Sequence, residues 1–373
     1  MPLLKSVPIR NFEITIARRA TIPQLILLVA LLIGSGAVLA VDDLPDEEDL
    51  KVLQIPNTSG WSGFVLFGAA NVDFESNLVA GNGLIDIGNA TIDSVFDAPR
   101  SDDDTYGALT GEIKYTFAEQ RTQVFLGSSI ENLVTFDFTQ QLGVRRAYSA
   151  AGVFSAGLVL TGAPAEVWED PFLEGSPRVE TDRDKPGIRL EWDGIMGSGF
   201  EVQFAARDID IDNERSGQFL VTQGRLSRAD QRLLNRNGDQ YTATVSYAWQ
   251  LAPQHLLRPQ LGYRNNDLDG GAVRNDRYWL ELAYAYFANP LTLILTGEIG
   301  GSDFDSSNPI YGQRQDSTTV LLGVTLSYRL PTQSQRWSAF ANIIYVDDDS
   351  DIDFYDATAT SIILGAEYRF GNR

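Results

Sequence analysis

The chain has 373 residues, and 29 Lys and Arg stand against 50 Asp and Glu, a formal net charge of −21. Such an acidic chain is a poor partner for nucleic acid or an anionic membrane surface. It has no Cys and one His, which excludes disulfides, cysteine metal sites and a lipoprotein anchor, and weighs against His-based triads. Hydrophobic residues make up 43%, enough to bury a large core, so the length fits one large barrel or several soluble domains.

Residues 1–40 have the pattern of a secretory signal peptide. Four basic residues, the last of them Arg19, precede an uncharged stretch over Leu25–Val41, within which Val38-Leu39-Ala40 gives a small-x-Ala end. This order is typical of a cleaved export signal. A transmembrane anchor is the alternative, but the stretch is short for a bilayer span and contains Gly and Ser. We expect cleavage after Ala40 and export of the rest of the chain.

Residues 41–60 form an acidic segment with two prolines and one short apolar patch, Val52–Ile55. We expect a mobile periplasmic leader. A short plug that enters the lumen of a barrel is the alternative.

Residues 61–373 contain long runs in which apolar and more polar residues alternate. Side chains on a strand point to opposite faces, so each run has one apolar face. Runs of about ten residues exceed ordinary globular strands and match tilted strands that cross a bilayer. The predicted strands are 61–73, 105–118, 121–130, 136–146, 151–162, 187–195, 200–211, 239–250, 255–266, 276–287, 291–301, 316–329, 336–347 and 358–370.

The connections between these runs alternate between short turns and longer loops. Bacterial outer-membrane barrels have short periplasmic turns and long extracellular loops. Aromatic residues gather near the short turns, as in an interfacial girdle: Trp61, Phe117, Trp192, Phe200, Trp249, Tyr286, Tyr328, Trp337, Tyr368 and Phe370. The sequence therefore predicts an all-β fold, an antiparallel transmembrane β-barrel of about 14 strands in the outer membrane of a Gram-negative bacterium, with 12 or 16 strands as alternatives.

The last run resembles the C-terminal signal that the outer-membrane assembly machinery reads. Ile362, Leu364, Ala366, Tyr368 and Phe370 alternate on one face, although three residues follow the final aromatic instead of none. The expected partners are this machinery, outer-membrane lipid, lipopolysaccharide and a small solute.

If the apolar face is outward, the charged residues on the other face line the lumen. The predicted pore-lining residues are Glu112, Lys114, Arg145, Arg189, Glu191, Glu201, Arg207, Arg258, Arg264, Glu281, Glu298 and Arg329. These charges either brace the wall through cross-strand pairs or form separate basic and acidic ladders that orient a polar solute.

The excess negative charge falls in the predicted long loops, for example Asp102–Asp104 and Asp347–Asp349. Such a rim is either a solvated surface or a place that attracts cations, and it predicts a weak cation preference. We expect no metal site and no cofactor. Outer-membrane barrel enzymes need a His base near the outer rim, whereas His255 falls at a predicted short turn, so we expect no enzyme, and an acid-dependent barrel enzyme is a minor alternative.

Several segments resemble an uncharacterised family, a domain of unknown function, of Gram-negative outer-membrane β-barrel proteins. They are Ser59–Gly63, Glu166–Phe172, Arg178, Gly187–Trp192 and Leu234–Asp239. The resemblance implies one exported unit and supplies no catalytic residues. Trp168 and Phe172 fall in a predicted long loop, where we expect them to pack, for example on the barrel wall, instead of lying in water.

The predicted function is that of a porin-like channel that passes small polar solutes through a pore narrowed by extracellular loops. A non-conducting surface barrel that binds a partner or divalent cations through its acidic loops is the alternative.

Overall fold

A computed structural model describes residues 52–371, apart from residue 84. The predicted signal peptide and residues 41–51 of the predicted leader lie outside the described residues. Within residues 52–371, no helix combines the length and the apolar character that a membrane span requires.

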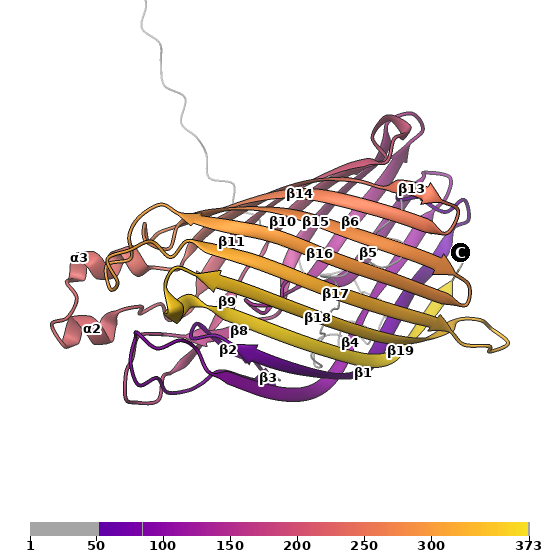
Figure 1. The fold of residues 1–373 in the computed structure, drawn as a ribbon. Coiled ribbons are helices and arrows are strands. Elements are labelled where there is room, and N and C mark those ends of the chain that lie inside the picture. The colour runs from indigo at the N-terminus through magenta and orange to yellow at the C-terminus, as the bar shows by residue number, and fades with distance from the viewer. Residues whose placement is uncertain (1–51, 84, 372–373) are drawn as a thin grey trace, which may run out of the picture. The chain divides into compact units, whose positions relative to one another are not determined.

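Fourteen antiparallel strands form a closed β-barrel (Figure 1). The barrel closes where β1 pairs with β19, from Ser62 opposite Gly371 to Glu75 opposite Thr358. Closure pairs every wall strand on both sides, which satisfies the backbone polar groups inside a bilayer. The wall strands are β1 (Gly60–Glu75), β4 (Ser101–Phe117), β5 (Thr122–Asn132), β6 (Asp137–Tyr148), β7 (Gly152–Ala163), β10 (Gly187–Asp193), β11 (Phe200–Ile211), β12 (Gly238–Tyr247) with β13 (Trp249–Ala252), β14 (His255–Leu268), β15 (Asn275–Ala288), β16 (Leu291–Phe304), β17 (Ser317–Arg329), β18 (Trp337–Ser350) and β19 (Ala357–Gly371). The predicted fold class and strand order are confirmed.

The two ends of the barrel differ in their connections (Figure 1). One end, the short-turn end, has brief links such as residues 289–290, although residues 194–199 there include η1 (Ile195–Gly197). The other end, the long-loop end, carries the remaining elements. They are β2 (Val79–Asn82), β3 (Ile85–Asp86), β8 (Ala165–Trp168), β9 (Glu180–Asp184), α2 (Gln218–Thr222), α3 (Arg228–Gln231), η2 (Arg232–Leu234) and η3 (Asp353–Tyr355).

The outward face of the wall is apolar. On β17, Leu322 is 57% exposed, whereas Leu321 and Thr325, which point inward, are buried. Exposed aliphatic residues recur on every side of the barrel, which is expected of a surface that faces lipid. At the short-turn end, exposed aromatic rings pair: Phe154 stacks on Trp192 at 4.9 Å between ring centroids. His255 contributes to the same band, with its Nδ1 atom 2.6 Å from the Tyr284 hydroxyl.

Residues of the long-loop end pack on inward-facing residues of β1, β17, β18 and β19. Phe136, in the β5–β6 turn, has a φ of 52°, and its buried ring lies edge-on to Phe74 at 5.0 Å. This group, the wall cluster, comprises Val72, Phe74, Val79, Ile85, Ile87, Leu133, Val134, Phe136, Phe138, Ala165, Leu321, Ile344, Val346, Ala357 and Ala359. The β2–β3 segment and the β5–β6 turn therefore lie against the inside of the wall.

The connections also pack on one another. Phe172 is buried and stacks on Phe354 at 5.3 Å, and Arg178 lies over the Trp168 ring at 4.3 Å. The Asp170 carboxylate accepts hydrogen bonds from the backbone N–H groups of Gly217 and Phe219, at 2.9 and 2.7 Å. Burial raises the pKa of Asp170, and these hydrogen bonds only partly offset the shift. Trp168 and Phe172 therefore pack as expected, and Phe172 packs largely on other loops.

Candidate functional site in the barrel interior

Charged side chains point into the barrel at two depths. On β11, which starts at the short-turn end, Glu201 is the second residue and Arg207 the eighth. On β14, which starts at the same end, Arg258 is the fourth residue and Arg264 the tenth. We call the deeper group the inner tier: Glu112, Lys114, Arg145, Glu191, Asp193, Glu201 and Arg258. The group toward the long loops is the outer tier: Asp137, Arg183, Lys185, Arg207, Arg264, Arg277 and Glu298.

The inner tier contains short ion pairs, one within β4 and two that join different strands. Glu112 lies 2.8 Å from Lys114 and 3.2 Å from Arg145, and Glu201 lies 2.8 Å from Arg258. Basic residues on β4, β6 and β14 flank a group of acidic residues on β10 and β11. The arrangement is that of a brace between strands, the first of the two interpretations made from the sequence.

Three inner-tier carboxylates come close enough together to hold a cation. Carboxylate oxygens of Glu191, Asp193 and Glu201 lie within 4.8 Å of one another. Arg258 already pairs with Glu201, and the backbone N–H of Leu53 donates to Asp193 at 2.5 Å. Two of the three carboxylates, Glu201 and Asp193, therefore already accept from the chain's own donors, which fits an ion-pair network better than a metal centre.

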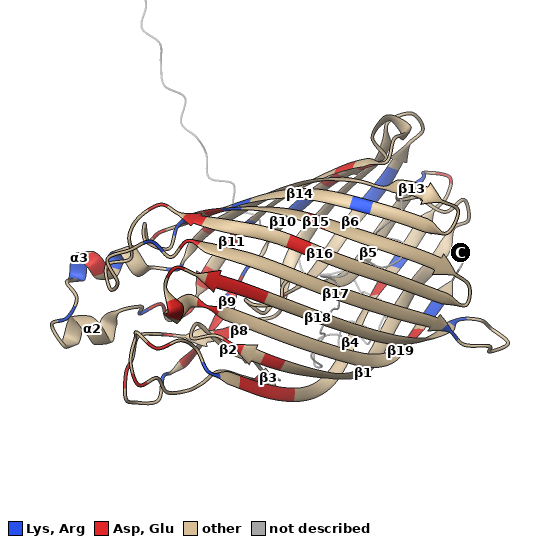
Figure 2. Cartoon of the chain, in the orientation of Figure 1, with Lys and Arg blue, Asp and Glu red and all other residues tan. Residues whose placement is uncertain are grey.

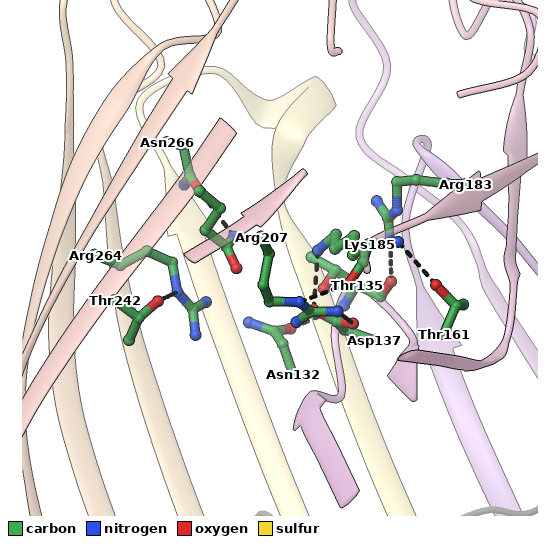
Figure 3. Close-up of polar contacts among 11 residues, drawn as sticks. Asn132, Thr135, Asp137, Thr161, Arg183, Lys185, Arg207, Thr242, Arg264 and Asn266 are labelled. Atoms are coloured by element: carbon green, nitrogen blue, oxygen red, sulfur yellow. Dashed lines mark hydrogen bonds and ion pairs between the residues drawn. The ribbon is translucent and has the colours of Figure 1, made fainter. Parts of the chain in front are cut away.

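The outer tier centres on Asp137, the first residue of β6 (Figure 3). Both oxygens of its carboxylate accept hydrogen bonds from Arg207, each at 2.8 Å, and the Lys185 ammonium lies 3.1 Å away. Arg183 donates to the backbone carbonyl of Thr135 in the β5–β6 turn. Asp137, Lys185 and Arg207 are all buried.

Arg183 and Lys185 reach the interior because of a strand that is not part of the barrel wall. β9 pairs with β8 and with the end of β11, where Ile211 lies opposite Arg183. The chain then enters β10 through Lys185 and Pro186. The β8–β9 hairpin therefore brings two cations from a connection to the side of Asp137.

Arg264 and Arg277 extend the outer tier along β14 and β15, where they lie directly opposite each other. Arg264 donates to the Thr242 hydroxyl at 3.3 Å and lies 5.6 Å from the Trp279 ring centroid. Arg277 pairs with Glu298 at 2.7 Å and donates to the Thr319 hydroxyl at 2.8 Å. The Trp279 ring occupies the space over Gly262, where a Cβ atom would come within 2.0 Å of it.

Burial lowers the pKa of Lys185 to about 7. Asp137 opposes this shift, whereas Arg183, Arg207 and Arg264 add to it. Three guanidinium groups therefore lie within electrostatic range of the Lys185 ammonium.

The residues predicted to line the pore lie on the inward face at different positions. Eleven of the twelve lie in the two tiers or between them. The two between the tiers are Arg189, which donates to the Gln141 side-chain amide oxygen at 3.3 Å, and Glu281, which lies opposite Glu298. Arg329 instead lies at the short-turn end, 3.3 Å from the Asn289 side chain. Their role in a pore stays a prediction.

The alternation also places Asp137 on the inward face, but the sequence prediction leaves out three cations of the outer tier, Arg183, Lys185 and Arg277. Arg277 follows the same alternation as Trp279 and Glu281, so the period of β15 could have found it. Arg183 and Lys185 lie outside any wall strand, so no alternation of inward and outward side chains predicts which way they point. Acidic residues are concentrated instead at the long-loop end of the strands (Figure 2).

The model of a family described as "Protein of unknown function (DUF2860)" matches residues 60–369. The chain belongs to this family. No curated protein matched the chain.

Solved structures of outer-membrane proteins are similar to the chain at low identity. The outer-membrane channel DcaP of Acinetobacter baumannii is 8% identical, with 86% of this chain and 100% of that chain covered and a TM-score of 0.39. OmpT, an outer-membrane protein of Vibrio cholerae, is 10% identical, with 86% and 99% covered and a TM-score of 0.39. The CymD monoaromatic hydrocarbon channel is 9% identical, with 83% and 89% covered and a TM-score of 0.40.

Proposed function

We propose that this protein is a channel in the outer membrane of a Gram-negative bacterium that passes small polar solutes. Its long-loop end faces the outside, and its loops narrow the pore. A fourteen-stranded barrel encloses more space than side chains of the wall can fill. Charged groups on the inward face suit a water-filled passage, as the apolar groups on the outward face suit lipid.

The wall cluster is the observation that best supports a pore narrowed by the loops. Connections that only covered the rim would have no reason to pack on inward residues of β1, β17, β18 and β19. Phe136 holds the β5–β6 turn in this position, because its ring is buried against Phe74 and Phe138. Asp137 follows in the chain and ties the same turn to Arg207 and Lys185.

Planar-bilayer conductance of the wild type and of Phe136→Asn tests the proposal. Asn tolerates a positive φ, so the substitution keeps the turn geometry and removes the ring that holds the turn inside. We expect a small conductance for the wild type and a severalfold larger one for the variant. Phe96→Asn is the control, because Phe96 is a loop aromatic that is 61% exposed, and it should conduct like the wild type. If neither the wild type nor Phe136→Asn conducts, the channel proposal is wrong.

A surface barrel that binds cations is the second candidate, and one observation favours it. A cavity of about 440 Å³ at the long-loop end is lined by four carboxylates, those of Asp303, Asp316, Asp349 and Asp351. This candidate predicts a barrel that does not conduct and that Ca²⁺ stabilises. Its unfolding temperature should rise when Ca²⁺ is added, and Asp316→Asn should abolish the rise. The channel predicts conductance whether or not Ca²⁺ is present.

A further inference from the structure

We infer that residues 52–59, which we call the strap, cross the short-turn mouth of the barrel and are anchored on its far side by Asp193. The strap thereby obstructs the end of the pore opposite to the long loops. That the strap limits the passage of solutes rests on the proposed function, whereas the crossing itself does not.

The first observation is the anchor on the far side. Asp193 is 3% exposed, and its carboxylate accepts a hydrogen bond from the backbone N–H of Leu53 at 2.5 Å. Asp193 ends β10, and carboxylate oxygens of the inward-facing Glu191 and Glu201 lie within 4.8 Å of its own. A hydrogen bond to a carboxylate is stronger than one between neutral groups, and here it gives a crowded carboxylate a donor. Leu53 therefore lies inside the barrel, beside the inner tier.

The second observation is the anchor on the near side. The strap leads directly into β1, which begins at Gly60 at the short-turn end. The Ser59 hydroxyl accepts a hydrogen bond at 3.0 Å from the backbone N–H of Ala118, in the β4–β5 turn. Residues 52–59, all of them described, form neither helix nor strand. Identified contacts therefore hold the strap at both of its ends.

The third observation is the length of the strap. On the shorter way around the barrel, β4, β5, β6 and β7 separate β1 from β10. Steps of about 4.8 Å between strands, taken along the rim of a barrel whose strands tilt by about 40°, give a path of about 31 Å. The chain from Gly60 to Leu53 reaches at most about 25 Å when it is fully extended. The strap is too short to follow the rim, so it cuts across the opening.

The apolar side chains of the strap agree with this position. Val52, Leu53 and Ile55 are half-buried, whereas Gln54 between them is exposed. The Val52 Cγ1 atom lies 2.9 Å from the place that a Cβ atom on Gly194 would take, directly after β10. A leader that lay free in water would gain nothing from this apolar patch. The contacts support the short plug, which the sequence offered as the alternative to a mobile leader.

Disulfide formation tests the crossing, because the chain has no Cys of its own. Val52→Cys is combined with Gly194→Cys or, as the matched control, with Gly197→Cys. Both glycines have a positive φ, 62° and 78°, but a Cβ atom on Gly197 would have no atom within 4 Å. The folded barrel in detergent is oxidised with copper phenanthroline, and the cross-linked fraction is read from a gel. We expect the pair with Gly194→Cys to cross-link at least tenfold faster than the control.

Equal rates for the two pairs, or no cross-link in either, would overturn the crossing. Heat-modifiable mobility on a gel shows that each variant is folded. If Gly194→Cys does not fold, single-cysteine labelling with a polyethylene-glycol maleimide replaces it. Val52→Cys should then react at least fivefold more slowly than Gln54→Cys, and equal reactivity would mean that the strap lies free.

Conductance in the Phe136→Asn background tests the obstruction, because the loops should no longer limit the current there. Leu53→Pro removes the N–H that Asp193 accepts and leaves every charge in the lumen in place. We expect it to raise the conductance at least twofold, whereas Gln54→Pro, the control, should not. Equal conductance of the two variants would overturn the obstruction. A cross-link in a barrel that never conducts would support the crossing while overturning the channel, so the two proposals fail separately.

Discussion

The inner and outer tiers use the same residue types in different ways. In the inner tier, Glu201 and Arg258 meet across β12, the strand that separates β11 from β14, and both are near the short-turn end. In the outer tier, Asp137 on β6 pairs with Arg207 on β11 and with Lys185 from a connection. The ion pairs of the inner tier therefore join wall strands, whereas the pairs at Asp137 in the outer tier also need a connection to be in place.

This difference indicates which tier responds to the loops. A brace between nearby wall strands persists when a loop moves. A carboxylate shared by the β5–β6 turn, β11 and the chain that follows β9 loses partners when either connection moves. We therefore expect a movement of these loops to change the ion pairs of the outer tier and to leave those of the inner tier in place.

The largest effect is expected when the centre of the outer tier is removed. Asp137→Ala leaves Arg207 and Lys185 buried without their carboxylate, which should cost about 3–5 kcal/mol of unfolding free energy. Urea unfolding in detergent, followed by tryptophan fluorescence, measures the loss. Glu112→Ala is the matched change in the inner tier, where Lys114 and Arg145 keep some exposure, and should cost about 1.5–3 kcal/mol. A larger loss for Glu112→Ala would contradict the proposed difference between the tiers.

A smaller net effect is expected when the charges of one pair are exchanged. The double variant Glu201→Arg/Arg258→Glu restores an inner-tier pair and should unfold within about 1 kcal/mol of the wild type. The corresponding exchange, Asp137→Arg/Arg207→Asp, should not recover, because the new Arg at position 137 then faces Lys185. Both double variants are compared with their single substitutions by the same urea unfolding. Recovery of both pairs would mean that Lys185 contributes nothing to the outer tier.

The strands followed from the sequence, whereas the positions of Lys185 and Phe136 did not. The two-residue period over 316–329 predicts both the position of β17 and the outward direction of Leu322, because one physical rule governs every residue of a wall strand. Lys185 obeys no such rule, since its position depends on the pairing of β9 with β8 and β11. The same is true of Phe136, whose inward direction follows from a turn with a positive φ. Contacts between distant connections leave no local pattern in the chain.

The smallest effect is expected from pH. Burial holds the pKa of Lys185 at about 7 in the folded protein, against roughly 10.4 when exposed. Above pH 7 the folded state therefore binds fewer protons than the unfolded state, and stability should rise by up to about 1 kcal/mol between pH 7 and pH 8. The charged groups around Lys185 are Asp137, Arg183, Arg207 and Arg264, and repulsion from the three arginines decreases as Lys185 loses its proton. Urea unfolding at the two pH values measures the rise, and Lys185→Met should remove it. A stability that falls over this window in the wild type would show that the Asp137 contact outweighs burial.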